Sequence, residues 1–263
     1  MKLSHYWDIY KVQLKNNWVR EAVYRTNFLT TMAVDLVWIA VEFTFFSVIY
    51  SNTNTLAGWS PPQVYFFLGI FFASDALFTT FFQRNFWNFS DLVNKGQLDI
   101  LLTKPVSPIF LALSQSINLT ASFNFVLGLA IVFHYSGPAG FSGGWKWLLL
   151  ILWLLVGLLT ALLVRFAFSI WVFWTERSWA ISRLYYQFFA IATKPDALFP
   201  KAIRYVILTA LPFAFIGSVP ARALLNGLEL WEYGLIAVVL GTFYVLDVYL
   251  WRKGLSRYQS ASS

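Results

Sequence analysis

The feature that most constrains the fold is an apolar run, Trp147–Val164, that contains no charged residue. A helix rises about 1.5 Å per residue, so about 20 apolar residues cross the roughly 30 Å hydrocarbon core of a bilayer. The composition agrees, because 59% of the 263 residues are hydrophobic and 12% are charged, whereas a soluble domain carries about 25% charged residues. The chain is therefore predicted to be an all-α polytopic membrane protein.

Six segments are predicted to be transmembrane helices. The fourth starts at Trp145, includes the run above and continues as a helix toward Trp174. The other five are Asn27–Tyr50, Gln63–Phe82, Ile109–Phe133, Trp179–Thr193 and Tyr233–Trp251.

The segment Val206–Pro220 is apolar, but it is short for a span and contains Pro212 and Pro220. Proline removes a backbone donor and breaks the interior of a helix. Two interpretations compete, a seventh span or a re-entrant segment that enters and leaves on one side. A seventh span would put the basic residues after the last span outside, against the charge pattern. We therefore expect six spans and an extracytoplasmic re-entrant region at 195–232.

The distribution of basic residues predicts the orientation. With six spans, both termini and the loops at 84–104 and 174–183 share one side, and these segments hold most of the 19 Lys and Arg residues. The loops at 51–62 and 135–144 hold none. By the positive-inside rule both termini are cytoplasmic. This topology accounts for the net charge of +7 without nucleic acid, although the basic segment Lys194–Arg204 departs from it.

The N-terminal segment 1–25 has an apolar stripe at helical spacing and no apolar h-region of a signal peptide. The stripe consists of Leu3, Trp7, Tyr10, Leu14 and Trp18. This pattern predicts an amphipathic helix that lies on the membrane surface. The alternative is a cytosolic helix packed on the rest of the protein.

A polar loop, 84–106, separates the second and third predicted spans. Ser90 suits an N-cap and Gly96 suits the position after a helix end, so Asp91–Lys95 is predicted to form a short capped helix. A second amphipathic piece, Gln97–Thr103, follows it. Such short helices are unstable alone and must dock on something. The alternative is an ordinary cytoplasmic loop lying on the membrane.

Five ionisable residues fall inside predicted spans. They are Asp35, Glu42, Asp75, Arg165 and Asp247. Such groups are costly in lipid unless they are paired or hydrated, so they normally face the bundle interior. Asp35 and Glu42 lie two helical turns apart and share a face. Asp35 and Arg165 have comparable depths, and we expect them to pair. These charges either line a pathway or form structural contacts between helices.

The sequence contains no phosphate-binding loop. The pattern G-x-x-x-x-G-K-[ST] is absent, and no Gly is followed by Lys. With no cysteines and two isolated histidines, no metal site is expected. If ATP drives this protein, it is hydrolysed on another chain.

Two groups of motifs resemble ABC-2 type permeases. The run KGQLDILLTKPVS, Lys95–Ser107, is similar to the segment after their second span, where a Gly begins a Leu-rich amphipathic stretch closed by Pro and a small residue. The later LPFAFI, Leu211–Ile216, and VPA, Val219–Ala221, resemble one bacterial branch of the family. The resemblance extends over essentially the whole chain, as a single transmembrane domain 1–263.

The resemblance implies a type V exporter-like permease subunit that is not itself an enzyme. It implies pairing with a second permease, identical or homologous, and with two copies of a cytosolic ABC ATPase. ATP and Mg would bind to that ATPase, and no cofactor to this chain. The location implied is a bacterial inner membrane.

The resemblance also assigns roles to segments. Residues 1–25 would form the elbow helix, and Pro212, Phe213, Phe215 and Pro220 would belong to a re-entrant lid. The ATPase-coupling residues would be Asp91, Leu92, Val93, Asn94, Lys95, Gly96 and Gln97. The main rival is an ATP-independent carrier or channel subunit. An intramembrane enzyme would need a His/Asp/Glu or Ser/His cluster, which two histidines disfavour.

Overall fold

The computed structural model describes residues 3–23, 25–175 and 178–258. This part of the chain is helical apart from turns and one isolated bridge between Leu56 and Trp59. The α-helices are α1 (Leu3–Val23), α2 (Arg25–Tyr50), α3 (Pro61–Phe78), α4 (Arg84–Asn94), α5 (Leu98–Leu102), α6 (Pro108–Ser114), α7 (Ala121–Ser136), α8 (Lys146–Ser169), α9 (Ser178–Phe189), α10 (Lys201–Leu208), α11 (Ser218–Leu225) and α12 (Leu230–Arg257). Shorter elements are the π-helix η1 (Thr79–Gln83) and the 3₁₀ turns η2 (Ile170–Phe173), η3 (Ala190–Thr193), η4 (Asp196–Leu198) and η5 (Phe213–Phe215).

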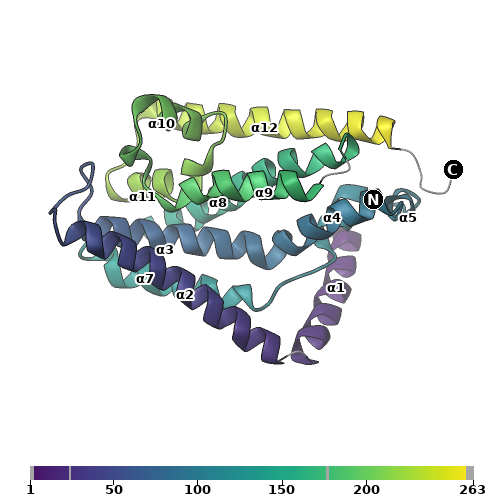
Figure 1. Ribbon diagram of the computed structural model, residues 1–263, viewed down its shortest axis with the longest axis horizontal. Coiled ribbons are helices and arrows are strands. Elements are labelled where there is room, and N and C mark those ends of the chain that lie inside the picture. Colours follow the sequence, from purple (N-terminus) through teal and green to yellow (C-terminus); the bar gives the residue numbers. More distant parts are fainter. Residues whose placement is uncertain (1–2, 24, 176–177, 259–263) are drawn as a thin grey trace.

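The long helices run along the length of the molecule, and α1 crosses them at one end (Figure 1). That end carries both termini together with α4 and α5, and we call it the α4–α5 end. The opposite end, the α10–α11 end, carries α10, α11 and the turn between α2 and α3. The bundle thus has two chemically different ends.

Four helices in the described residues are long and apolar enough to cross a membrane. They are Leu29–Tyr50, Pro61–Asn94, Lys146–Phe173 and Leu230–Arg257. The prediction of an all-α polytopic membrane protein is confirmed. The remaining two predicted spans correspond to shorter helices, α7 and α9 followed by η3.

The second predicted span is longer than the sequence indicated. Ser60 and Gln63 form a capping box at its start, and α3, η1 and α4 then continue without a break to Asn94. These 34 residues extend about 51 Å, well beyond the roughly 30 Å hydrocarbon core. The helix is therefore long enough to extend beyond the hydrocarbon core at one end.

The prediction of one continuous helix over Ile109–Phe133 is wrong, because the chain breaks between α6 and α7. Asn85 fastens the break: its Nδ2 donates to the Ser116 carbonyl and its Oδ1 accepts from the Ser116 N–H, both at 2.8 Å. The Asn118 N–H donates to the Thr80 carbonyl at 2.8 Å, and Asn17 Nδ2 donates to the Gln115 carbonyl at 3.1 Å. Non-helical backbone inside a membrane protein requires such internal partners.

Glycine allows α3 and α7 to pack closely. A Cβ atom on Gly128 of α7 would lie 2.6 Å from the backbone nitrogen of Ala73. A Cβ on Gly69 of α3 would lie 2.8 Å from the backbone nitrogen of Val132. Because backbone meets backbone at both points, no side-chain rearrangement can make room.

The segment between α9 and α12 contains no long helix. Its two α-helices, α10 and α11, have eight residues each, or about 12 Å, which is too short to cross a bilayer. Residues 212–221 are all buried. A Cβ on Gly217 would lie 2.9 Å from ring atoms of Phe67 and from Phe71 Cβ. This segment is therefore inserted against α3.

Gly128→Val should destabilise the helix bundle. Inserting atoms into a packed interface costs about 1–3 kcal/mol, and here the backbones of α3 and α7 must separate. We expect a lower thermal midpoint of the purified protein in detergent. Gly241→Val on α12, where a Cβ meets nothing within 4 Å, is the control, and an equal loss in both variants would contradict the packing argument.

Candidate functional site

The predicted helix start in the polar loop is wrong, and its end is right. Ser90 lies inside α4, which begins at Arg84, so it caps nothing. Lys95 is the C-cap of α4, and Gly96 follows with φ of +70°, the left-handed conformation expected there. Asp91 and Lys95 form an exposed ion pair of 2.7 Å. The loop is thus the end of a long helix and not an independent capped turn.

A surface at the α4–α5 end combines polar and apolar side chains, and we call it the α4–α5 surface. Its exposed members are Asp91, Asn94, Lys95, Gln97, Ile100, Leu102, Thr103 and Lys104. Ile100 is 62% exposed, whereas Leu98 and Leu101 of the same helix are buried. Four of the predicted coupling residues therefore face solvent, Leu92 and Gly96 are half-buried, and Val93 is buried.

Aromatic rings connect this surface to the long helices. The rings of Phe89 of α4, Phe173 of η2 and Trp251 of α12 lie 5.7–6.2 Å apart between centroids. A Cβ on Gly254 would lie 2.4 Å from Phe173, so α12 also approaches closely. A displacement of α4 must therefore also displace η2 and α12, because tightly packed side chains are nearly incompressible.

Tyr258 follows α12 and lies beside Asp99 of α5. Burial, together with the neighbouring Asp99 carboxylate, raises the pKa of the Tyr258 phenol. Asp99 belongs to α5, so α5 lies beside the end of the last long helix. The Tyr258 ring also packs edge-on against Phe173 of η2 at 6.1 Å.

The expected ion pair between Asp35 and Arg165 is wrong. Asp35 accepts a hydrogen bond from Asn124 Nδ2 at 2.6 Å. Arg165 Nη2 donates instead to Ser182 Oγ at 3.2 Å. Comparable depth along two helices did not bring the two side chains to the same face.

Glu42 has a partner that the sequence did not suggest. Its carboxylate lies 2.5 Å from Lys194 Nζ, and the lysine also lies over the ring of Phe45, 4.2 Å from its centroid. Glu42 is buried and Asp35 is half-buried on the same side of α2, as their spacing predicted. Lys194 was noted only as an exception to the charge pattern.

The other two predicted intramembrane carboxylates also turn away from the surface. Asp75 is half-buried on α3, and Asp247 is buried on α12. Within the described chain, neither carboxylate oxygen of Asp247 has a hydrogen-bond partner. An acidic group without a partner is costly inside a membrane protein.

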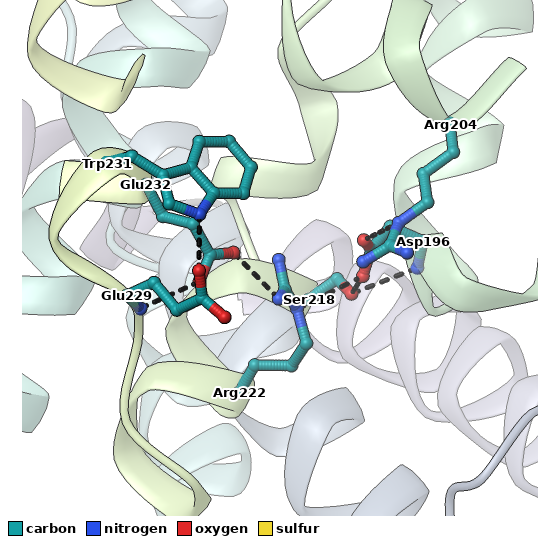
Figure 2. Close-up of polar contacts among 7 residues, drawn as sticks. All are labelled: Asp196, Arg204, Ser218, Arg222, Glu229, Trp231 and Glu232. Atoms are coloured by element: carbon teal, nitrogen blue, oxygen red, sulfur yellow. Dashed lines mark hydrogen bonds and ion pairs between the residues drawn. The ribbon is translucent and has the colours of Figure 1, made fainter. Parts of the chain in front are cut away.

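An ionic cluster holds the α10–α11 end together (Figure 2). Asp196 is 0% exposed; it accepts from Arg204 Nε at 2.8 Å and lies 3.6 Å from Arg222 Nε. Ser218 donates its hydroxyl to the same carboxylate. Arg222 also reaches Glu232 of α12 at 2.9 Å. The cluster thus joins η4, α10 and α11 to the start of α12.

These contacts explain two of the three basic residues in the segment that departed from the positive-inside pattern, and exposed Lys201 remains an exception. Lys194 and Arg204 both carry carboxylate partners, so neither is a free positive charge. The missed signal was the presence of Glu42, Asp196 and Glu232 near the same predicted end.

The predicted lid residues Pro212, Phe213, Phe215 and Pro220 are all buried. The ring of Phe213 packs edge-on against Tyr185 and Phe189 of α9, with centroids 5.9 and 5.8 Å away. The segment therefore lies among α3, α8 and α9 rather than over them.

The fold defines a polytopic α-helical membrane protein with a projecting helix at one end. A family model described as ABC-2 family transporter protein matches residues 36–262. The chain belongs to this family, and the resemblance seen in its motifs is confirmed. No curated protein and no solved structure matches it.

Membership makes the chain a permease component of an ABC transporter. Such a component is the membrane part of the transporter and not its catalytic ATPase, and it implies partnership with an ABC ATPase subunit.

Asp196→Ala should destabilise the α10–α11 end. The change leaves Arg204 without its carboxylate and Arg222 with one acidic partner, and removing one member of a buried pair costs about 3 kcal/mol. We expect a lower thermal midpoint and faster proteolysis between α9 and α12. Lys201→Ala, at an exposed neighbour on α10, should change little, and equal effects would show that the cluster is not structural.

Proposed function

We propose that this protein is the permease half of an ATP-driven exporter, working by alternating access with two copies of a cytosolic ABC ATPase and a second permease. The observation that carries the proposal is the projecting helix. The α4–α5 surface lies at the end of a continuous helix whose other part, α3, forms the centre of the bundle. Contact at that surface can act on the bundle without an intervening flexible loop.

We place the α4–α5 end on the cytoplasmic side. Most basic residues of the described chain belong to this end. Of those at the other end, Lys194, Arg204 and Arg222 are ion-paired, and Lys146 and Lys201 remain as exceptions. Counting α6–α7 and α9–η3 as the third and fifth spans gives six, with both termini inside a bacterial cytoplasmic membrane. Helix α1, crosswise to the others (Figure 1), is then the elbow helix.

The exposure of α1 supports this role. Trp7 and Leu14 of the predicted apolar stripe are exposed, whereas the ring of Tyr6 packs edge-on against Phe110 at 4.9 Å and Asn17 is buried. The face of α1 that carries Tyr6 and Asn17 packs against the rest of the protein. The exposed apolar side chains lie on another face, where a membrane interface would cover them.

The region 195–232 is proposed to be a re-entrant lid at the outer end. Its short helices, its buried middle and its ionic cluster fit a segment that enters among the spans and leaves on the same side. ATP and Mg are proposed to bind only to the ATPase. A carrier or channel that works without ATP is disfavoured by family membership.

Ile100→Asp should detach the ATPase. Ile100 is 62% exposed, so a charge there disturbs a contact and not the core, whereas an Asp at buried Val93 would disturb the core itself. Central apolar contacts are typically worth at least about 2 kcal/mol, or about 30-fold in affinity. Co-purification from native membranes should show loss of the ATPase and normal insertion of the permease.

The matched control is Leu230→Asp, at a residue 88% exposed at the other end of the molecule. It should retain the ATPase. Retention by Ile100→Asp, or loss in both variants, would refute the α4–α5 surface as the docking site.

Single cysteines can test the topology, because the chain has none of its own. We expect cysteines at Asn54, Lys201 and Asn226, all exposed, to react with an impermeant thiol reagent from outside intact cells. A cysteine at exposed Asn94 should react only after the cells are opened. Labelling of Lys201 and Asn226 positions from opposite sides would establish a seventh span instead.

A further inference from the structure

Arg165 of α8 differs from the other basic residues. It is 1% exposed, and in the described part of the chain it is the one basic residue that is buried. Lys194, Arg204 and Arg222 each lie against a carboxylate, but no described acidic side chain pairs with Arg165. An unneutralised charge at such a position costs several kcal/mol.

Aromatic rings stabilise this cation in part. The guanidinium carbon lies 4.7 Å from the ring centre of Tyr185, 5.3 Å from that of Tyr186 and 5.9 Å from that of Phe86. A desolvated cation–π contact stabilises a buried cation. Ring faces stabilise the charge but do not accept all of its N–H groups.

Hydrogen-bond donors remain unused around the guanidinium. Arginine has five N–H groups, and the described partner is Ser182, which accepts from Nη2. Arg165 Nε and the hydroxyl of Tyr185 are both buried and have no partner among the described residues. Buried polar groups normally find partners, so these two groups are available to a ligand that brings hydrogen-bond acceptors.

A cleft with suitable chemistry lies beside the guanidinium. Arg165 lines it together with three hydroxyls from three helices, Ser90 of α4, Ser169 of α8 and Ser182 of α9. The rest of the lining is apolar, namely Phe168, Val172 and Ile181. A cation surrounded by hydroxyl groups is the donor set that binds phosphate or carboxylate oxygens.

We propose that Arg165, Ser90, Ser169 and Ser182 form the binding site for the anionic headgroup of an amphiphilic substrate. This inference rests on the proposed transport function and adds the chemical class of what is transported. In the present conformation the cleft is too narrow to hold even a water molecule. The substrate therefore binds only in a conformation in which the helices around the cleft, α4, α8 and α9, lie further apart.

The position of Arg165 along its helix indicates that the substrate is an amphiphile and not a small ion. Arg165 lies eight residues before the end of η2 at Phe173, or about 12 Å along the helix. The apolar part of the lining, Phe168, Val172 and Ile181, can contact an alkyl chain but cannot hydrogen-bond to the hydration shell of a small anion. An alkyl or polyprenyl chain would accompany its headgroup to this depth at little cost.

The test uses the intact permease–ATPase complex in nanodiscs of phosphatidylcholine. ATP hydrolysis is titrated with dodecyl phosphate, dodecanol, dodecyltrimethylammonium and methyl phosphate. Equilibrium binding of radiolabelled dodecyl phosphate provides a readout that does not depend on hydrolysis. We expect stimulation and saturable binding with dodecyl phosphate, and none with the other three probes.

Variants assign the effect to the cleft. Ser169→Ala removes one hydroxyl and should weaken dodecyl phosphate binding about tenfold, the value of a hydrogen bond to a charged group. Arg165→Gln should abolish binding, and Arg165→Lys should retain part of it. Lys146→Gln at the other end of α8, whose Nζ contacts the Leu224 carbonyl, should bind normally.

Equal responses to the anionic and cationic probes, or unchanged binding in Arg165→Gln and Ser169→Ala, would overturn the proposal. Equal stimulation by methyl phosphate would overturn the amphiphilic part of it. Failure of the proposed function looks different: the wild-type complex would then lack any ATPase subunit. A complex that hydrolyses ATP but ignores dodecyl phosphate refutes the substrate class alone.

Discussion

The structure depends on the requirement that backbone polar groups inside a bilayer find partners within the protein. Long helices satisfy it by themselves, and a broken one needs help. Where α6 and α7 part, the side chain of Asn85 gives and receives hydrogen bonds with the Ser116 backbone. Asn85 belongs to α4, so the residue that repairs the third span also anchors the projecting helix. Because the Asn85 side chain serves both purposes, the break between α6 and α7 and the position of α4 are structurally coupled.

The sequence predicted the parts of the fold that depend on local pattern. Apolar length located all four long helices, although it ended the second one twelve residues too early, and Gly96 identified the end of α4 by its conformational freedom. The helix start predicted at Ser90 was wrong, because a residue suited to an N-cap is also tolerated inside a helix. The break after α6 was not predictable, since no local signal distinguishes a run that stays straight from one that is repaired by a distant Asn.

The candidate site was predicted less completely, and for a similar reason. Asp91–Gln97 was located by composition and resemblance, yet which of its side chains face outward depends on the register of α4, and Val93 points inward. The prediction that Asp35 pairs with Arg165 was wrong because it compared only their depths along the two helices. It did not consider the direction in which each side chain points around its helix axis. Partners such as Glu42 and Lys194 lie on segments far apart in sequence, so their pairing depends on tertiary packing.

The π-helix η1 lies within the longest helix, between α3 and α4. A π turn holds one extra residue, so its hydrogen bonds are looser and its rotation differs from that of the helix on either side. The rod is therefore stiff along both arms and compliant at one point. A sideways displacement of α4 therefore bends the helix at η1 first, and α3 receives only what that bend does not absorb.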